Sequence, residues 1–445
     1  MSFVMIFIYR LFFIPLFLLS APFYLSRKLS RDKNISDWPQ YLGLFPKLPS
    51  RSNHPQAKRI WIQAVSVGEV LAIEPLIKKL QKTPNVEVIL TTTTSTGYKE
   101  AKERYSGVAY GIGLFPIDFW LCSALAWSRI QPDMIILAES ELWPEHIHRA
   151  SKKGVPVFLI NARMSDQSYA KLKCFKPLAQ YLFDKIQTVY CATQIDYERF
   201  SDLGAKPENK IGNIKLDVDF GLPLPPSDKI AQLKTMGFRE NEVSSESSFI
   251  LIGASTWPGE ESLLLNAQKY CLNAGISCEL ILVPRHVERR GEIKKLLNEQ
   301  ALSWSSANGD AGNTSLEQAK SQMIFFSDTT GNLAHLLKVS DLAFIGKSMP
   351  PNEGGQTPVE AAAQGIPILF GPNMSNFKTI SNELLVSGAA QFITSQNDLN
   401  TQVLQLAKDT QARAKMKEAG LRWHEANKGI ISEIGDAILQ TLKLS

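Results

Sequence analysis

The stretch RIWIQAVSVGEVLAIEPLIKKLQKTPNVEVILTTT, residues 59–93, decides the fold class of this chain. Its two ends, residues 59–65 and 86–93, are short apolar runs rich in β-branched residues. The longer segment between them is amphipathic and begins with the small residues Ser66 and Gly68. Apolar runs bounded by turns and separated by a helical pattern are typical of βαβ units on a buried parallel sheet. The stretch therefore predicts a parallel α/β fold.

The same alternation continues on both sides of a polar, proline-containing segment. Further buried strands are expected at residues 133–139, 155–161, 188–193, 249–255, 280–285, 342–346 and 366–371. A chain of 445 residues is too long for one ordinary core. We expect two doubly wound, Rossmann-like domains, residues 35–220 and 249–445, joined by a linker at 221–248. Ligands should bind where the carboxyl ends of the strands of the two domains face each other.

The first 26 residues are almost entirely apolar, interrupted by Arg10, Pro15 and Pro22. This length suits one membrane helix, and the three interruptions leave a tilted or shallow anchor as an alternative. A cluster of basic residues follows: Arg27, Lys28, Arg31 and Lys33. Positive charge after the segment places the body of the protein on the cytoplasmic side of the membrane.

Composition excludes several classes of protein. The formal net charge of +5 is too small, and basic residues too scattered, to indicate nucleic-acid binding. The five cysteines are scattered and form no CxxC pair, which argues against a structural zinc site. The mild positive charge instead suits an anionic substrate or membrane surface.

Three carboxylates follow strands in the first half of the chain. Glu69 lies at the start of the helix that follows strand 59–65, where its charge either takes part in chemistry or only complements the helix dipole. Glu139 and Glu141 lie at the end of the strand expected at 133–139, beside Trp143. This group is typical of a sugar-acceptor site, and the alternative is capping of the following helix.

The second half offers residues suited to a nucleotide. Ser255 lies in a turn of small residues before a helix, a common phosphate site. Arg285 follows Pro284 at the end of a strand and suits a phosphate or carboxylate. Gly354 and Gly355 precede a helix expected near Pro358, with Glu360 in its first turn. The triplet DVD, residues 217–219, matches a metal-binding pattern of sugar transferases, but it lies away from the nucleotide half, and we interpret it as structural.

Nine motifs in order give the chain a family resemblance. They are SVGE (66–69), TTTTSTG (91–97), ESELWP (139–144), NARMSD (161–166), GNIKLD (212–217), ASTWPGEE (254–261), PRHVER (284–289), DTTGNL (328–333) and GGQTPVE (354–360). Together with NFK (376–378), the set resembles the 3-deoxy-D-manno-octulosonic acid (Kdo) transferases and spans most of the chain after the apolar segment.

The resemblance implies a GT-B glycosyltransferase that inverts the sugar configuration. It implies CMP-Kdo as donor, a lipid A precursor (lipid IVA) as acceptor in lipopolysaccharide inner-core synthesis, and a metal-independent mechanism without a cofactor. It also implies a protein anchored to the cell inner membrane, with its catalytic domains on the cytoplasmic side.

The resemblance also implies roles for individual residues. Glu69 would be the general base, and Glu139 or Glu141 and Lys215 would stabilise charge around the transfer. The residues implied to bind CMP are Pro284, Arg285, Thr330, Gly331, Asn332, Thr357, Pro358, Val359 and Glu360. Ser255, Gly354 and Gly355 complete the expected substrate site.

The sequence departs from the family pattern at Gln356 and Thr357, where His and Asn are usual, and at Thr330 and Asn332. Two other functions therefore stay open. One is a GT-B transferase that uses a UDP-sugar, and the other is a nucleotide-sugar-binding protein without catalysis. The retained Glu69 argues against the second.

Overall fold

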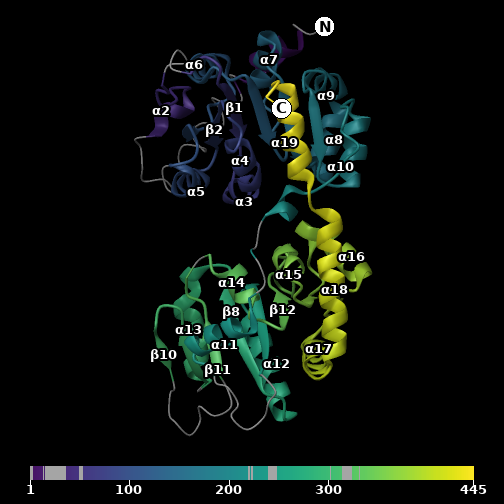
Figure 1. Cartoon of the computed structure of the whole chain (residues 1–445). Helices are drawn as coiled ribbons and strands as arrows, with labels where there is room; N and C mark the ends of the chain where they lie inside the picture. The colour runs from purple at the N-terminus through teal and green to yellow at the C-terminus, as the bar shows by residue number, and fades with distance from the viewer. Residues whose placement is uncertain are drawn as a thin grey trace. The chain divides into compact units, whose positions relative to one another are not determined.

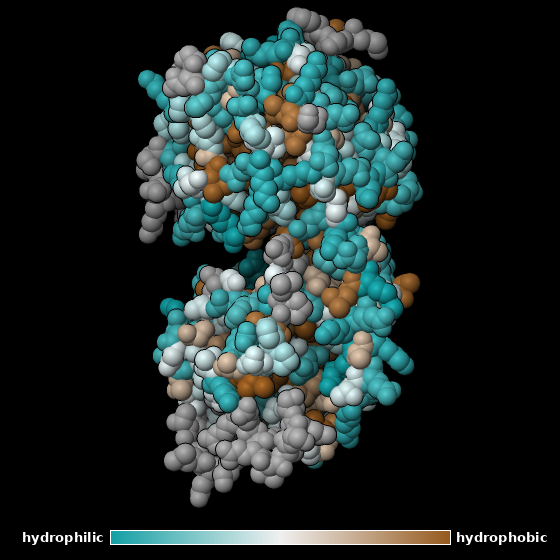
Figure 2. All heavy atoms as spheres, in the orientation of Figure 1, coloured by the Kyte–Doolittle hydropathy of each residue, from teal (hydrophilic) through white to brown (hydrophobic). Residues whose placement is uncertain are grey.

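The computed structural model describes residues 4–13, 15, 37–49, 54–218, 221, 224–238, 248–300, 302–312, 323–329 and 331–444. The chain forms two compact units (Figure 1). Unit 1 comprises Met1–Asp219 and Asn427–Ser445, and unit 2 comprises Phe220–Ala426. On the face shown in Figure 2, hydrophilic residues cover most of each unit and apolar residues occur in small groups.

Unit 1 contains a six-stranded parallel sheet in the order β3-β2-β1-β4-β5-β6. Its strands are β1 (Lys58–Gln63), β2 (Val86–Thr92), β3 (Gly111–Leu114), β4 (Met134–Ala138), β5 (Val157–Ala162) and β6 (Thr188–Cys191). The inner strands β4 and β5 are buried along their whole length. Continuous apolar runs suit this position because helices cover both faces of a parallel sheet.

The connections between these strands are helical. They are α3 (Val67–Ala72), α4 (Glu74–Gln81), α5 (Ser95–Tyr105), α6 (Trp120–Ile130), α7 (Pro144–Lys153), α8 (Asp166–Cys174), α9 (Lys176–Phe183) and α10 (Gln194–Asp202). The 3-10 helix η3 (Ile214–Asp217) follows β6, and the short α2 (Trp38–Tyr41) precedes β1. The strand order reverses between β1 and β4, so a crevice is expected at their carboxyl ends.

Unit 2 contains an eight-stranded sheet in the order β10-β9-β11-β8-β7-β12-β13-β14, parallel except for β10. Its strands are β7 (Phe249–Thr256), β8 (Cys278–Pro284), β9 (Ser303–Ser306), β10 (Ala311–Gly312), β11 (Met323–Phe326), β12 (Leu342–Ile345), β13 (Ile368–Phe370) and β14 (Ala390–Phe392). Here the order reverses between β7 and β12.

The helices of unit 2 follow the same alternating pattern. They are α11 (Pro226–Thr235), α12 (Glu260–Asn273), η4 (Val287–Arg289), α13 (Arg290–Glu299), α14 (Leu333–Leu337), α15 (Val359–Ala363), η6 (Ser375–Phe377), α16 (Lys378–Ser387), α17 (Gln396–Lys408) and α18 (Thr410–Asn427). The expected linker, 221–248, thus contains helix α11 within unit 2.

The end of the chain lies in unit 1, whereas the sequence had placed all of residues 249–445 in the second domain. Helix α19 (Ile430–Thr441) packs against α4 and η3, as Figure 1 shows for α19 and α4. Its apolar stripe, which includes Ile430, Ile434 and Ile438, is buried in the core on one side of the sheet. This burial explains why the helix belongs to unit 1. A helix with such a stripe is stable when the stripe is buried, and the core of unit 1 buries it.

Asp217 ties this returning segment to unit 1. Its carboxylate accepts hydrogen bonds from the backbone N–H groups of Gly429 and Ile431, at the start of α19. A carboxylate at a helix N-terminus satisfies donors that have no partner within the helix. Asp217, the first residue of the DVD triplet, therefore has a structural role, and Asp219 lies outside the described residues.

Part of the expected membrane anchor packs onto unit 1. Residues 4–13, called here the N-terminal helical segment, are helical, and Ile6 joins the core. The Arg10 guanidinium donates to both carboxylate oxygens of Glu145, at 2.9 and 2.7 Å, and the Tyr9 hydroxyl donates to Asp118 at 2.7 Å. Most of residues 14–26 lie outside the described part of the chain. Among the described helices, none combines the length and apolar character needed to cross a membrane.

Loss of the buried face of α19 should destabilise unit 1. We expect Ile434→Ala, at a position with no exposed surface, to lower the free energy of unfolding by about 2–5 kcal/mol because it leaves a cavity. Ile195→Ala is the matched control, since Ile195 is 50% exposed on α10, and it should change stability by less than about 0.5 kcal/mol. Denaturant unfolding of the full chain measures both. Equal small effects would contradict the packing of α19.

Candidate active site

A group of charged residues gathers where the strand order of unit 1 reverses. Glu69 follows β1 on α3, Glu139 and Glu141 follow β4, and Lys215 lies on η3 after β6. Glu139 and Lys215 are joined by an ion pair, and the charges of both residues affect the pKa of Glu69. The structure therefore brings together the four residues that the sequence nominated for chemistry in the first domain.

Glu69 is buried and held in a fixed orientation. One carboxylate oxygen accepts from the backbone N–H of Val65 at 2.8 Å, and the other accepts from the Ser66 hydroxyl at 2.9 Å. Burial raises the pKa of Glu69, and the Glu139 carboxylate adds to this rise, while the Val65 N–H, the Ser66 hydroxyl and Lys215 oppose it. The carboxylate thus holds the turn that precedes its own helix. Its raised pKa is also typical of a candidate general base.

The other two carboxylates differ in their surroundings. The Lys215 ammonium lies 2.7 Å from one Glu139 oxygen, and both side chains are partly exposed. Among the described residues, Glu141 has no such cation, and its buried Oε2 has no hydrogen-bond partner. Burial raises the pKa of Glu141 to about 7, aided by the charge of Glu69 and opposed by the Trp143 indole. Glu141 thus differs from a simple helix cap.

In unit 2, two carboxylates already occupy the turn in which Ser255 lies. Glu260, at the start of α12, accepts from the backbone N–H groups of Trp257, Lys347, Ser348 and Met349. Glu261 accepts two hydrogen bonds from Arg289 and one from Thr256. Ser255 itself has a left-handed backbone, with φ of 57°. The two carboxylates in the first turn of α12 are therefore engaged by donors of the protein itself.

Arg285 and Glu360 remain available to a ligand. Arg285 follows Pro284 at the end of β8, and its exposed side chain makes no hydrogen bond or ion pair with a described residue. Glu360 is half-buried on α15, and burial raises its pKa with no described hydrogen-bond donor to offset it. Thr357, Pro358 and Val359 precede or begin this short helix, and the Thr357 hydroxyl accepts from the Val359 N–H at 3.4 Å.

The glycine-rich loop is fixed beside the end of β12. Gly354 and Gly355 have φ of 106° and 71°, a backbone that residues with a side chain rarely adopt. Gly355 donates to the Lys347 carbonyl at 2.9 Å, and the Gly354 carbonyl accepts from Asn376 at 2.9 Å. A Cβ on Gly355 would meet Met374 at 2.5 Å. The conformation therefore favours glycine here, and a side chain at position 355 would also displace Met374.

The remaining predicted residues lie after β11. Gly331 has φ of 88°, and Asn332 precedes α14 and donates from its side chain to the Thr329 hydroxyl at 2.7 Å. Thr330 lies outside the described residues. Within the described ranges, no group of three or more His, Cys, Asp or Glu residues is arranged to hold a metal ion.

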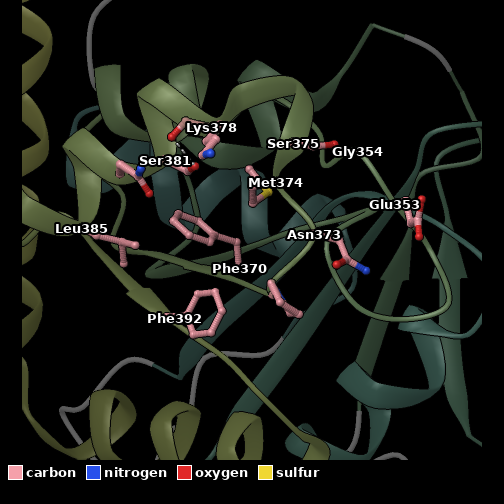
Figure 3. Close-up of a pocket in the computed structure, with 13 residues that line it drawn as sticks. Glu353, Gly354, Phe370, Asn373, Met374, Ser375, Lys378, Ser381, Leu385 and Phe392 are labelled. Atoms are coloured by element: carbon pink, nitrogen blue, oxygen red, sulfur yellow. Dashed lines mark hydrogen bonds between the residues drawn. The ribbon is translucent and has the colours of Figure 1, made fainter. Parts of the chain in front are cut away.

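A cavity of about 390 Å³ lies next to the glycine-rich loop (Figure 3). Gly354, the loop that contains Asn373 and Ser375, and the first turns of α16 enclose it together with the Phe370 and Phe392 rings. Lys378 of the NFK motif also lines it. The sequence predicted a role for Gly354 and the NFK motif. It did not predict the Phe370 and Phe392 rings, because these residues end two different strands and share no sequence motif.

Comparisons with known proteins identify relatives of this chain. A family model described as 3-Deoxy-D-manno-octulosonic-acid transferase (kdotransferase) matches residues 36–218. The chain is 29% identical over 388 residues to a 3-deoxy-D-manno-octulosonic acid transferase of Haemophilus influenzae, covering 86% of this chain and 87% of the relative. It is 30% identical over 377 residues to the enzyme of the same name from Rickettsia bellii, covering 84% and 86%.

A solved structure supports the fold. MurG of Acinetobacter baumannii matches with a TM-score of 0.56 and 13% identity, covering 86% of this chain and 99% of that chain. At this identity the match concerns the fold alone, and it supports the expected GT-B-like α/β class. The resemblance seen in the nine motifs is confirmed by the relatives, which match this chain over most of their own length. The chain is a glycosyltransferase and belongs to the 3-deoxy-D-manno-octulosonic acid transferase family.

Proposed function

We propose that this protein transfers Kdo from CMP-Kdo to a lipid A precursor such as lipid IVA, with inversion and with Glu69 as the general base. The observation that carries the proposal is the Glu69 carboxylate, buried at the switch point of the sheet, oriented by two hydrogen bonds and close to the Lys215–Glu139 pair. Family membership supplies the identity of the sugar. The alternative of a binding protein without catalysis gives no reason to retain this arrangement.

In the proposed reaction, an acceptor hydroxyl attacks the anomeric carbon of Kdo. Its oxygen forms the new glycosidic bond, Glu69 takes its proton, and the bond to the CMP phosphate oxygen breaks with its electron pair. A general base of this kind must be ionised to act, and a pKa raised toward neutrality makes it a stronger proton acceptor. Lys215 and the Glu139 carboxylate stabilise charge near the reacting atoms during this step. Glu141 lies in the same cluster.

The donor carries a phosphate and a carboxylate, both anionic. Arg285 is exposed and without a described partner, so it is suited to one of these groups. Glu360 is suited to the ribose hydroxyls, which can donate to a carboxylate that has no other described donor. We assign Gly354 and Gly355, with the adjacent residues Thr357, Pro358 and Val359, to the same donor site, together with Gly331 and Asn332. The mechanism uses no metal ion.

We further propose that the apolar N-terminal residues hold the protein at the inner membrane, with both units on the cytoplasmic side. The inner face of the N-terminal helical segment binds unit 1 through Ile6 and Arg10. Its outer face remains apolar, and Phe7 and Phe12 are 63% and 60% exposed. Exposed aromatic residues of this kind favour a lipid surface over water.

The first prediction concerns the base. Glu69→Gln keeps the shape of the side chain and removes its basicity, so turnover with CMP-Kdo and lipid IVA should fall by about 10²–10⁴-fold. CMP affinity should remain at the parent value. Glu103→Gln, on the exposed surface of α5, is the matched control and should keep full turnover. CMP release and CMP calorimetry measure these effects, and near-parental turnover of Glu69→Gln would remove Glu69 from this role.

The second prediction separates two parts of the donor site. Arg285→Ala should weaken CMP binding and reduce its dependence on salt, because an ionic contact is lost. Glu360→Ala should weaken binding by roughly 1.5–3 kcal/mol and leave the salt dependence nearly unchanged, because ribose hydroxyls are neutral. EDTA should change neither variant nor the parent. Calorimetry over a salt series measures all three, and equal salt slopes, or a strong EDTA effect, would contradict the assignment.

The third prediction concerns the membrane. Replacing both Phe7 and Phe12 by Glu should reduce binding to anionic lipid vesicles at least about tenfold, because charge is costly within the apolar part of a bilayer. The variant keeps the partly buried Arg10–Glu145 pair intact. Val386→Glu, at a residue that is 90% exposed in unit 2, is the control and should bind like the parent. Vesicle flotation at high salt is the assay. Salt-resistant binding of the double variant at the parental level would contradict the proposal.

A further inference from the structure

Asn161 has three unusual features for a residue in a buried strand. It lies near the end of β5, its side chain has no exposed surface, and its φ is 53°, in the left-handed region. The register between β5 and β6 also shifts between Leu159 and Ala162, which is the position of Asn161. Such irregularities re-aim a side chain and often lie beside active sites. The conformation is costly, so contacts of the side chain are expected to offset the cost.

The Asn161 amide joins two elements that carry candidate catalytic residues. Its Nδ2 donates to Glu139 Oε1 at 3.4 Å, and its Oδ1 accepts from the backbone N–H of Ile214 at 3.3 Å. The two partners fix the amide orientation, because a carboxylate can only accept and a backbone N–H can only donate. Asn161 therefore links the end of β4 to η3.

These contacts complete a closed ring of interactions. Lys215 directly follows Ile214, and its ammonium lies 2.7 Å from Glu139 Oε1, the oxygen that also accepts from Asn161. The Lys215 backbone is fixed from the other side, where its N–H donates to Asn213 Oδ1 at 3.0 Å. Asn161 thus holds the backbone next to Lys215 in place through Ile214. It also orients Glu139 Oε1, the oxygen to which the Lys215 ammonium is paired.

We propose that Asn161 is a positioning residue for the transfer reaction, which fixes the Lys215–Glu139 pair beside Glu69 from a strained position at the end of β5. This inference rests on the proposed function, in which Glu69 is the base. Asn161 opens the NARMSD motif, but the sequence gave it no role, because neither the register shift nor the left-handed backbone can be recognised from a sequence pattern.

The direction of the expected change follows from the charges around Glu69. The groups that face it are Glu139 and Glu141, after β4, and Lys215, on η3. Glu139 raises the pKa of Glu69 and Lys215 lowers it. Without the Asn161 side chain, η3 loses one tether, and Lys215 should spend less time near the carboxylates. The pKa of Glu69 should then rise, and the base should become ionised only at higher pH.

Asn161→Gly is the sharpest test, because glycine adopts the left-handed backbone without strain and removes only the side chain. We expect kcat/KM with lipid IVA to fall about 10- to 100-fold at neutral pH through misplacement of the charged pair. The acidic limb of the pH profile should move upward by about 0.5–1 pH units. The KM for CMP-Kdo should stay unchanged, since the donor residues lie in unit 2.

The matched control is Asn85→Gly. Asn85 is also left-handed, with φ of 61°, but it is exposed and precedes β2 at the opposite end of the sheet. This variant should keep the parental rate and pH profile. Asn161→Asp is a second variant that keeps the acceptor for Ile214 and tolerates the same backbone. It replaces the donor to Glu139 by a carboxylate oxygen, so it should move the acidic limb in the same direction.

A measurement without substrates separates this inference from the proposed function. NMR titration of ¹³C-labelled glutamate carboxyls, with the Glu69 signal identified by its absence in Glu69→Gln, reads the pKa of Glu69 in the full chain directly. A higher pKa in Asn161→Gly and Asn161→Asp supports the inference even if the parent does not turn over CMP-Kdo, which would count against the proposed function alone. A parental Glu69 pKa in both variants would overturn the inference, whatever happens to the rate.

Discussion

The ion pair between Lys215 and Glu139 is the interaction on which the candidate active site depends. It joins residues 76 positions apart in the sequence, one after β4 and the other on η3 after β6, at a distance of 2.7 Å. The charge of Glu139 raises the pKa of Glu69, and the charges of Glu69 and Glu139 both raise the pKa of Glu141. One cation in their midst allows part of this cluster to stay ionised, because like charges packed together otherwise favour the neutral form.

The parallel sheets explain why these residues meet. In unit 1, Glu69, Glu139 and Glu141 follow β1 and β4, the two strands between which the strand order reverses. In unit 2, Glu360 follows β12, one of the two strands at the corresponding reversal. A crevice is expected at such a point because the helices leave it in opposite directions. The charged residues of unit 2 form two groups that differ in whether they have a partner within the protein. Glu260 and Glu261 are occupied by the protein's own donors, whereas Arg285 and Glu360 have no described partner. A carboxylate or guanidinium without a partner is the more suitable group for a ligand, since binding breaks no internal contact.

The sequence predicted the core of the fold because buried parallel strands are continuous apolar runs. It missed five strands: β3, β9, β10, β11 and β14. Four of them are short and contain glycine, serine or glutamine, so they lack that signal. The other, β11, is apolar but only four residues long. It placed α19 in the wrong unit, because the partner of an apolar helical stripe cannot be identified from the stripe itself. At the site, the strand-end position predicted Glu69, Glu139 and Glu141. Asn161 escaped notice because its role depends on a register shift and on contacts across three elements.

The central claim is that the transferred sugar is Kdo and that CMP is the leaving group. The most direct measurement offers the parent protein an equal mixture of CMP-Kdo and a UDP-sugar, with lipid IVA as acceptor and detergent to keep the lipid accessible. Mass spectrometry then identifies the lipid products and the free nucleotides. The account predicts Kdo-modified lipid with matching release of CMP and no consumption of the UDP-sugar. A lipid carrying the sugar of the UDP donor, with CMP-Kdo left intact, would contradict it.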